Sequence, residues 1–283
     1  MRKIKYLLTV AALSSTMMFG CGSNDNDSAD EAKEVSIDSV IEGIENADLD
    51  IKSLDFTIDA NIDMSLASED ENTDIKGSGN IKASLDNEAG LASLNISMTV
   101  DDQTQDMEAY LDYSDIENAV VYLNQQGVWM KQSLENSAVS VDPSAISEGT
   151  NSDSIKKFVE SLKDAKAEET DDYYTISGTL DTSKLLEEMT SAADGTMGDA
   201  LSAYAGILEE VKINVSISVN KDDYSFAKAN ISIKDFEYEM MGSTLKVNSI
   251  SIDVAAKNYN NIDTITIPDD AKDAISLDDM SSF

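Results

Sequence analysis

The chain of 283 residues is strongly acidic, with 55 Asp and Glu against 20 Lys and Arg and a formal net charge of −35. This charge excludes nucleic acid as a natural partner, because the phosphate backbone would be repelled. The sequence has no histidine and one cysteine, so the commonest general base is missing and no intramolecular disulfide can form. It also lacks a nucleophile elbow, a phosphate-binding glycine loop and a histidine-based metal site. We therefore expect a protein that is not an enzyme and that needs no cofactor or metal.

The N-terminal residues 1–20 have the layout of a signal peptide. Three basic residues lie among the first five, and a mostly apolar stretch runs from Tyr6 to Phe19. This stretch of about fourteen residues is too short to cross the hydrocarbon core as a helix, which takes about twenty. Residues 18–21, Met-Phe-Gly-Cys, resemble the lipobox of bacterial lipoproteins. The resemblance implies cleavage before Cys21 and attachment to the membrane through an N-terminal diacylglyceryl-cysteine.

Residues 21–35 are predicted to form a flexible acidic tether. The run from Gly22 to Glu31 contains no large apolar side chain, so it cannot bury a core. The alternating acids Asp25 and Asp27 suggest calcium binding, but the glycine and the distal glutamate of a calcium loop are missing. The sequence therefore predicts no metal site in the tether and one folded domain over residues 36–283.

Alternating apolar and polar residues predict long antiparallel strands after the tether. From Leu54 to Leu66, every second residue is apolar and the residues between them are polar, which is typical of a strand with one dry face. The acidic residues 69–72 predict a hairpin loop. Further strands of the same meander, joined by short turns, are expected over residues 75–85, 94–100, 107–113, 119–124 and 128–133.

The middle of the chain changes to a helical period. A helix is predicted over residues 155–162 and a strand over residues 173–180. Two further helices are predicted over residues 184–193 and 198–210, separated by a short breaker. Their apolar faces mix small residues with Met and Leu, and such a face can adapt to several shapes.

Strands return over residues 211–219, 227–233 and 245–254, and a last short strand over residues 264–267 stops at Pro268. A phase slip in the third of these predicts a bulge at residues 248–249. One dry face per strand suits either two packed sheets or one curved sheet. The helical insertion favours the curved sheet, because its concave side must be filled. The expected fold class is therefore α+β, a single strongly curved antiparallel sheet of about 11 strands, forming an unclosed half-barrel with helices packed on its concave side.

This order of elements resembles the LolA, LolB and LppX-like lipoprotein carriers. A helix over residues 38–47, the long sheet, the helices inserted after the seventh strand and the final short strand match their unclosed half-barrel. Residues 121–131, VYLNQQGVWMK, and residues 265–274, ITIPDDAKDA, look like a hairpin and a C-terminal ending that recur in Gram-positive lipoproteins of this fold. The resemblance implies a lipid-anchored protein on the extracytoplasmic face of the cell membrane. It also implies that an acyl chain or another hydrophobic small molecule binds between the sheet and a helical lid.

Inward-facing apolar residues are candidates for the wall of such a cavity. The alternative, that they form only a packed core, is equally consistent with the sequence, because Leu, Ile and Met are what any core contains. Trp129 follows a turn and either faces the cavity mouth or caps the core edge. Two classes of function stay open: a carrier of lipid-like molecules, and a structural or interaction module of the cell envelope whose protein partner is unknown. The cavity candidates are Phe56, Ile58, Ile96, Met98, Leu111, Trp129, Leu201, Leu208, Ile213 and Val215.

Overall fold

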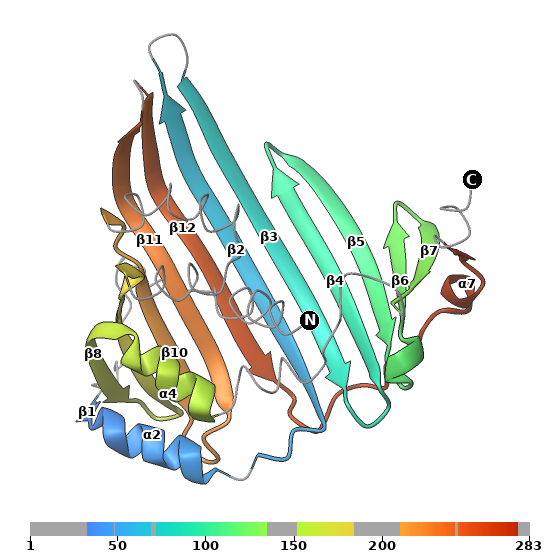
Figure 1. The fold of residues 1–283 in the computed structure, drawn as a ribbon, viewed down its shortest axis with the longest axis horizontal. Coiled ribbons are helices and arrows are strands. Elements are labelled where there is room, and N and C mark those ends of the chain that lie inside the picture. The colour runs from blue at the N-terminus through green and yellow to red at the C-terminus, as the bar shows by residue number, and fades with distance from the viewer. Residues whose placement is uncertain are drawn as a thin grey trace, which may run out of the picture. The chain divides into compact units, whose positions relative to one another are not determined.

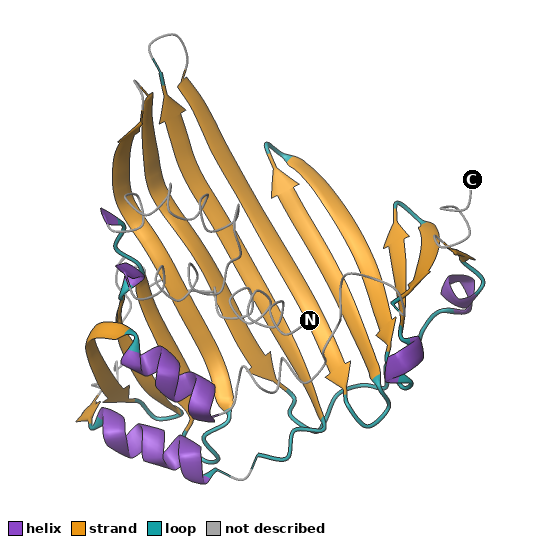
Figure 2. Cartoon of the chain, viewed as in Figure 1, coloured by secondary structure: helices purple, strands orange, loops and turns teal. Residues whose placement is uncertain are grey.

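The computed structural model describes residues 33–47, 49–68, 72–134, 152–183, 210–240 and 243–276. These residues are mostly β structure and form a single unclosed sheet of thirteen strands with few helices (Figures 1 and 2). The strand order is β1-β8-β9-β10-β11-β12-β2-β3-β4-β5-β6-β7-β13. The first long strand of the chain, β2, is therefore hydrogen-bonded on one side to β3 and on the other to β12, which comes late in the chain.

The strands and helices have the following bounds. The strands of the meander are β2 (Ser53–Ala67), β3 (Asn72–Asp86), β4 (Leu91–Val100), β5 (Gln103–Asp112), β6 (Val120–Gln125) and β7 (Val128–Ser133). The other strands are β1 (Lys33–Val35), β8 (Leu162–Glu169), β9 (Tyr173–Leu180), β10 (Asn214–Asn220), β11 (Phe226–Met240), β12 (Ser243–Lys257) and β13 (Ile275–Ser276). The helices within the described residues are α2 (Ile37–Asn46), α4 (Ser152–Glu160), α7 (Asp269–Lys272) and the 3₁₀ turn η1 (Ile116–Asn118).

Most of the predicted elements are confirmed. The meander is antiparallel from β3 to β7, and the helices predicted over residues 38–47 and 155–162 correspond to α2 and α4. The prediction of a strand over residues 264–267 is wrong, because this segment buries Ile265 and Ile267 without pairing in the sheet. Alternation of apolar and polar residues indicates which side chains are buried, but it does not show whether the segment is hydrogen-bonded to another strand. The helices predicted over residues 184–193 and 198–210 lie, apart from Glu210, outside the described residues.

Three strands were not predicted and one predicted strand is absent, so the count is thirteen where about eleven were expected. Two of them, β1 and β13, are the short strands at the two edges of the sheet. The third, β8, has an irregular register between Lys163 and Lys166, where Asp164 takes a left-handed φ of 53°. The bulge breaks the period of two that would have revealed this strand.

The described chain divides into two compact units, whose boundaries fall within β2, β3 and β12. The first unit comprises Met1–Leu49, Ala60–Lys76 and Ala145–Val254, and the second comprises Asp50–Asp59, Gly77–Ser144 and Ala255–Phe283. Each unit has its own buried residues and is described by itself.

The core of the first unit forms where α2 and α4 pack against β8, β9 and β10. The helix α2 places apolar residues at positions 37, 40, 41 and 44, which share one face at the helical period. Lys156 of α4 is paired with Glu45 of α2 at 2.9 Å between Nζ and Oε1. The fully buried residues of this core are Val40, Ile44, Ile155, Val159, Ala167, Ile176 and Val219.

The second unit is built on the meander from β3 to β7. Its register places Ala83, Leu94, Ala109 and Leu123 in one row across four strands, so the apolar residues of neighbouring strands share a face. The edge is completed by β13, which pairs with β7 in parallel. Lys131 of β7 donates a hydrogen bond from Nζ to the carbonyl oxygen of Lys272 in α7 at 2.7 Å.

Candidate functional site

The second unit has an apolar face that contains five of the predicted cavity residues. Ile81, Ile96 and Met107 are directly opposite one another on β3, β4 and β5. By the alternation of side chains, Met98 of β4 and Leu111 of β5 lie on this same face.

Phe56 and Ile58 of β2 also belong to the apolar face. Their neighbours Asp55 and Asp59 accept hydrogen bonds from Ser84 and Asn80 of β3, which places these acids on the polar face. Phe56 and Ile58 therefore point to the other side of the sheet. Both Phe56 and Ile58 are half-buried.

Exposure on the apolar face increases towards the turn between β4 and β5. Leu85 of β3 is buried and Ile96 is half-buried, whereas Met98 is 48% exposed and Val100 is 53% exposed. Leaving two neighbouring large apolar side chains this exposed on one face is unfavourable in water. At this end, the apolar face therefore has an exposed apolar surface whose burial by a binding partner would be favourable.

Two glycines explain the exposure of Met98 and Val100. The residues of β3 opposite them are Gly79 and Gly77, so the neighbouring strand supplies no side chain. On the other side, β5 supplies only Gln105 and Gln103. A hollow of about 320 Å³ results, lined by Met98, Val100, Asp101, Gln103 and Gln105.

The backbone at this end of the hollow is a tight turn. Asp101 and Asp102 connect β4 to β5 with φ values of 47° and 63°. Two consecutive residues with positive φ are typical of a type I′ turn, whose twist matches that of the flanking strands. The turn keeps β4 and β5 regular up to Val100, so the apolar side chains are presented by paired strands.

Three of the remaining predicted cavity residues, Ile213, Val215 and Trp129, lie elsewhere. Ile213 and Val215 belong to the first unit and are 9% and 4% exposed, so they behave as packed core. Trp129 lies on the polar face of the second unit, because it is opposite Asn124, which in turn is opposite Glu108. Its ring lies 6.0 Å from that of Tyr110. Leu201, Leu208 and Cys21 lie outside the described residues.

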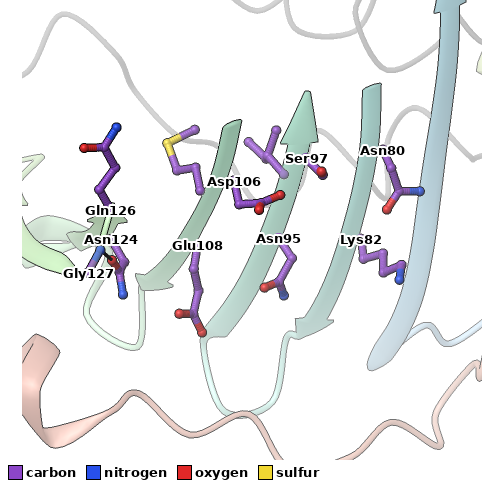
Figure 3. A pocket seen from close by; sticks show the side chains of 11 residues that line it. Asn80, Lys82, Asn95, Ser97, Asp106, Glu108, Asn124, Gln126 and Gly127 are labelled. Carbon is purple, nitrogen blue, oxygen red and sulfur yellow. Dashed lines mark hydrogen bonds between the residues drawn. The ribbon is translucent and has the colours of Figure 1, made fainter. Parts of the chain in front are cut away.

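A second hollow, which was not predicted from the sequence, lies on the polar side of the meander. Its volume is about 450 Å³, and its polar side chains come from β3, β4, β5, β6 and the turn between β6 and β7 (Figure 3). The alternate polar residues of the strands were the available signal, but polar alternation alone does not distinguish a hollow from a flat wet face. The lining residues are Asn80, Lys82, Asn95, Ile96, Ser97, Asp106, Met107, Glu108, Asn124, Gln126 and Gly127.

Burial raises the pKa of Tyr122 in the second unit, and it also raises the pKa of two other tyrosines there. Desolvation raises the pKa of Tyr113 to about 12, with a further contribution from the charge of Asp86. Burial also raises the pKa of Tyr110, and its hydrogen bond to Glu108 adds to the rise. Both tyrosines are therefore neutral hydrogen-bond donors at neutral pH. Within the described residues, no group of three or more acidic, His or Cys side chains is placed to hold a metal ion.

None of the helices in the described ranges is both long and apolar enough to cross a membrane.

Comparisons with known proteins place the chain beside families of unknown function. A family model described as "Family of unknown function (DUF6612)" matches residues 36–276. No curated protein matches the chain. Among solved structures, the chain is similar to a beta-barrel-like protein of the DUF1849 domain from Brucella abortus, at 9% identity and a TM-score of 0.26, over 71% of this chain and 97% of that one. It is also similar to a DUF1329 family protein from Desulfovibrio piger, at 8% identity and a TM-score of 0.20, over 81% and 92% of the two chains.

Proposed function

The chain belongs to the DUF6612 family of unknown function, and we propose that it binds a lipid or another apolar molecule on the apolar face of its sheet. We propose further that it does so as a lipoprotein anchored outside the cell. The observation that carries the proposal is the exposed pair Met98 and Val100 beside two glycines. Ligand pockets are mostly apolar and hold a few polar groups that orient the ligand. Gln103 and Gln105 are suited to that second task at the rim.

The exposed pair sets the scale of the binding energy. Fully burying a Val or Met side chain contributes about 1.5–3 kcal/mol. Since Met98 and Val100 are about half exposed, covering both would contribute a total of roughly 1.5–3 kcal/mol. This corresponds to about a 10- to 150-fold gain in affinity from these two residues alone.

The finer form of the proposal is a strongly curved half-barrel of the LolA, LolB and LppX type. What supports it is the order of elements and the two sequence motifs at residues 121–131 and 265–274. In this arrangement, the helices predicted over residues 184–193 and 198–210 would act as a lid and contribute Leu201 and Leu208. No enzymatic role is proposed.

The anchor is proposed to be a diacylglyceryl group on Cys21. The basic start, the short apolar stretch and the four residues ending in Cys21 support this. Two acyl chains would suffice for stable attachment, whereas one chain gives only marginal binding. The protein would then lie on the extracytoplasmic face of the cell membrane, at the surface of a Gram-positive bacterium.

Native mass spectrometry of the chain from Ser36 onward tests the proposal. After gentle purification from bacteria, we expect an added stoichiometric mass that disappears on lipid extraction and returns on incubation with a fatty acid or a phospholipid. The variant Gly77→Leu should fill the hollow and weaken binding at least about tenfold, through loss of the contacts with Met98 and Val100. An added Cβ at Gly77 would meet the Thr99 carbonyl oxygen at 3.4 Å, so the strand can accept the side chain.

The matched control is Ser78→Leu. It places the same side chain on the next residue of β3, but on the opposite face of the sheet. We expect this control to bind like the parent chain. An unliganded mass that persists after incubation with fatty acids and phospholipids would refute the lipid-binding proposal and favour an interaction module of the cell envelope.

A further inference from the structure

The polar hollow of the second unit has a shallow floor and raised sides. Its floor is the pair Asn95 and Ser97 on β4, which carry short side chains. Longer side chains flank them at the same register positions, with Lys82 of β3 and Glu108 of β5 on either side of Asn95. Asp106 flanks Ser97 in the same way. The hollow is therefore a consequence of side-chain length along three paired strands (Figure 3).

Several lining side chains have hydrogen-bonding capacity to spare. Within the described parts of the chain, the side chains of Lys82, Asn95, Ser97 and Asp106 have no hydrogen-bond partner. Asn124 uses its Oδ1 to accept a bond from the Gly127 N–H at 2.9 Å, which leaves its amide NH₂ as a donor. Together these groups offer both donors and acceptors over a surface of alternating amides and charges.

An aromatic surface borders the hollow on the same face. Trp129 is the register neighbour of Asn124, and its ring contacts that of Tyr110 at a tilt of 40°. Tyr110 donates a hydrogen bond from its hydroxyl to Oε1 of Glu108 at 2.9 Å, which orients this lining carboxylate. The hollow therefore adjoins two rings with both apolar faces and polar edges.

The charge of the hollow restricts the ligand. Its lining has two carboxylates, Asp106 and Glu108, against the single ammonium of Lys82, and the whole chain carries −35. An anionic ligand would be repelled. A hydroxyl group both donates and accepts, so a ligand rich in hydroxyls can satisfy amides, carboxylates and the ammonium at once.

We propose that this hollow binds a neutral, polyhydroxylated ligand, a short oligosaccharide, with Trp129 and Tyr110 as the stacking surface at one end. The distance from β3 to β6 is three strand spacings, about 14 Å, which suits several linked sugar rings better than one. The site is separate from the apolar hollow, since the residues that contact the sugar lie on the opposite face of the sheet. A protein with both sites would contact lipid on one face and glycan on the other.

Tryptophan fluorescence tests this proposal directly. Trp129 is the only tryptophan of the chain, so its emission reports on this region alone. The full chain, purified in a polyoxyethylene detergent that has no sugar headgroup, is titrated with chitotetraose, with maltotetraose and with tetragalacturonic acid. We expect a saturable change with at least one of the two neutral oligosaccharides and none with the anionic one.

Two variants localise the binding. Ser97→Tyr should block the floor of the hollow and weaken binding more than tenfold, and Ser78→Tyr is its matched control on the same face but outside the lining. Asn95→Ala removes an exposed side chain without a partner among the described residues, so the fold is retained, and it should weaken binding about three- to tenfold. Calorimetric titration of the same samples gives the affinities.

The proposal is overturned if neither neutral oligosaccharide changes the fluorescence or releases heat. It is also overturned if Ser97→Tyr and Asn95→Ala bind as tightly as Ser78→Tyr. Tighter binding of tetragalacturonic acid than of the neutral oligosaccharides would contradict the charge argument. Each of these results leaves the lipid test on the apolar face unaffected, because that test uses different residues and a different readout.

Discussion

The substitution Gly43→Ala should destabilise the first unit, although the same change stabilises most helices. Gly43 lies in the interior of α2, where replacing glycine by alanine ordinarily contributes about 1 kcal/mol. Here, however, a Cβ at this position would lie within 3.0 Å of the ring of Tyr224. The ring has little room to move, because it stacks on Tyr174 with centroids 5.5 Å apart.

The expected magnitude follows from these two opposing effects. Overpacking of a close contact costs about 1–3 kcal/mol, which exceeds the gain in helix propensity of about 1 kcal/mol. We expect a net loss of about 1 kcal/mol in the free energy of unfolding, which lowers Tm by about 2–4 °C in a domain of this size. In a Tyr224→Ala background, Gly43→Ala should instead stabilise by about 1 kcal/mol.

A double-mutant cycle measured by urea unfolding checks this prediction. The four proteins are the parent chain, the two single variants and the double variant. Because the effect of Gly43→Ala on unfolding free energy changes sign between the two backgrounds, the coupling between the two positions should be about 2 kcal/mol. If Gly43→Ala raises the stability of the parent chain, or if the two substitutions are additive, then Tyr224 does not cover Gly43 and the packing of α2 described above is wrong.

Four further predictions concern a buried core residue, two residues with shifted pKa values and the proposed lipid anchor. Ile176→Ala should cost about 2–5 kcal/mol of unfolding free energy, because Ile176 is 2% exposed in the core of the first unit; urea unfolding measures this, and a loss below the range would contradict tight packing there. The pKa of Tyr113 is raised to about 12. The contribution of Tyr113 to stability is therefore complete below its unfolded pKa of about 10 and is lost as pH rises towards 12. Tyr113→Phe should reduce this loss of unfolding free energy at alkaline pH, measured by urea unfolding. The hydrogen bond from Lys221 lowers the pKa of Glu169. The contribution of Glu169 to stability is therefore present above its unfolded pKa of about 4.3 and is lost as pH falls through the folded pKa. Glu169→Gln should reduce the loss of unfolding free energy at acid pH, and an unchanged acid loss would exclude the ion pair. Cys21→Ser should abolish labelling with palmitate and release the chain from the membrane fraction, and retained labelling would refute lipidation at this residue.

The faces of the strands could be predicted from the sequence, because a period of two is a property of each strand by itself. Ile81, Ile96 and Met107 were all placed on apolar faces, and the register brings them side by side. The partners of the strands could not be predicted in this way. Pairing of β2 with β12 depends on segments far apart in the chain, and alternation carries no information about which strand lies next.

Burial of polar residues is a second feature that alternation did not predict. The polar face of β10 was expected to be wet, yet Ser216 and Ser218 are each only 1% exposed. Both lie on a strand paired on its two sides: Ser216 is opposite Ser177 of β9 and Asn230 of β11, and Ser218 is opposite Thr175 and Lys228. Ser218 is hydrogen-bonded to Thr175 at 2.8 Å, and this pairing avoids the cost of a buried hydroxyl without a partner.

The candidate sites were predictable to different degrees. Met98 was identified as a cavity residue by its apolar face, but its exposure depends on Gly79 being its partner, which only the register shows. Trp129 was a cavity candidate because it follows a turn, with the cavity mouth and the core edge as the two expected positions. The structure places it on the polar face instead, since Asn124 and Trp129 are directly opposite one another.

The pairing of β2 with β12 affects how this protein can be made. During synthesis from the N-terminus, β2 emerges long before β12, so the backbone groups along one edge of β2 stay unpaired until β12 is made. Exposed long edges invite pairing with other chains, and contacts between distant segments form slowly. A chain that ends before Ser243 would never cover that edge of β2, and would also leave one edge of β11 open. Truncation or proteolysis near the C-terminus should therefore increase association of the protein through its strand edges.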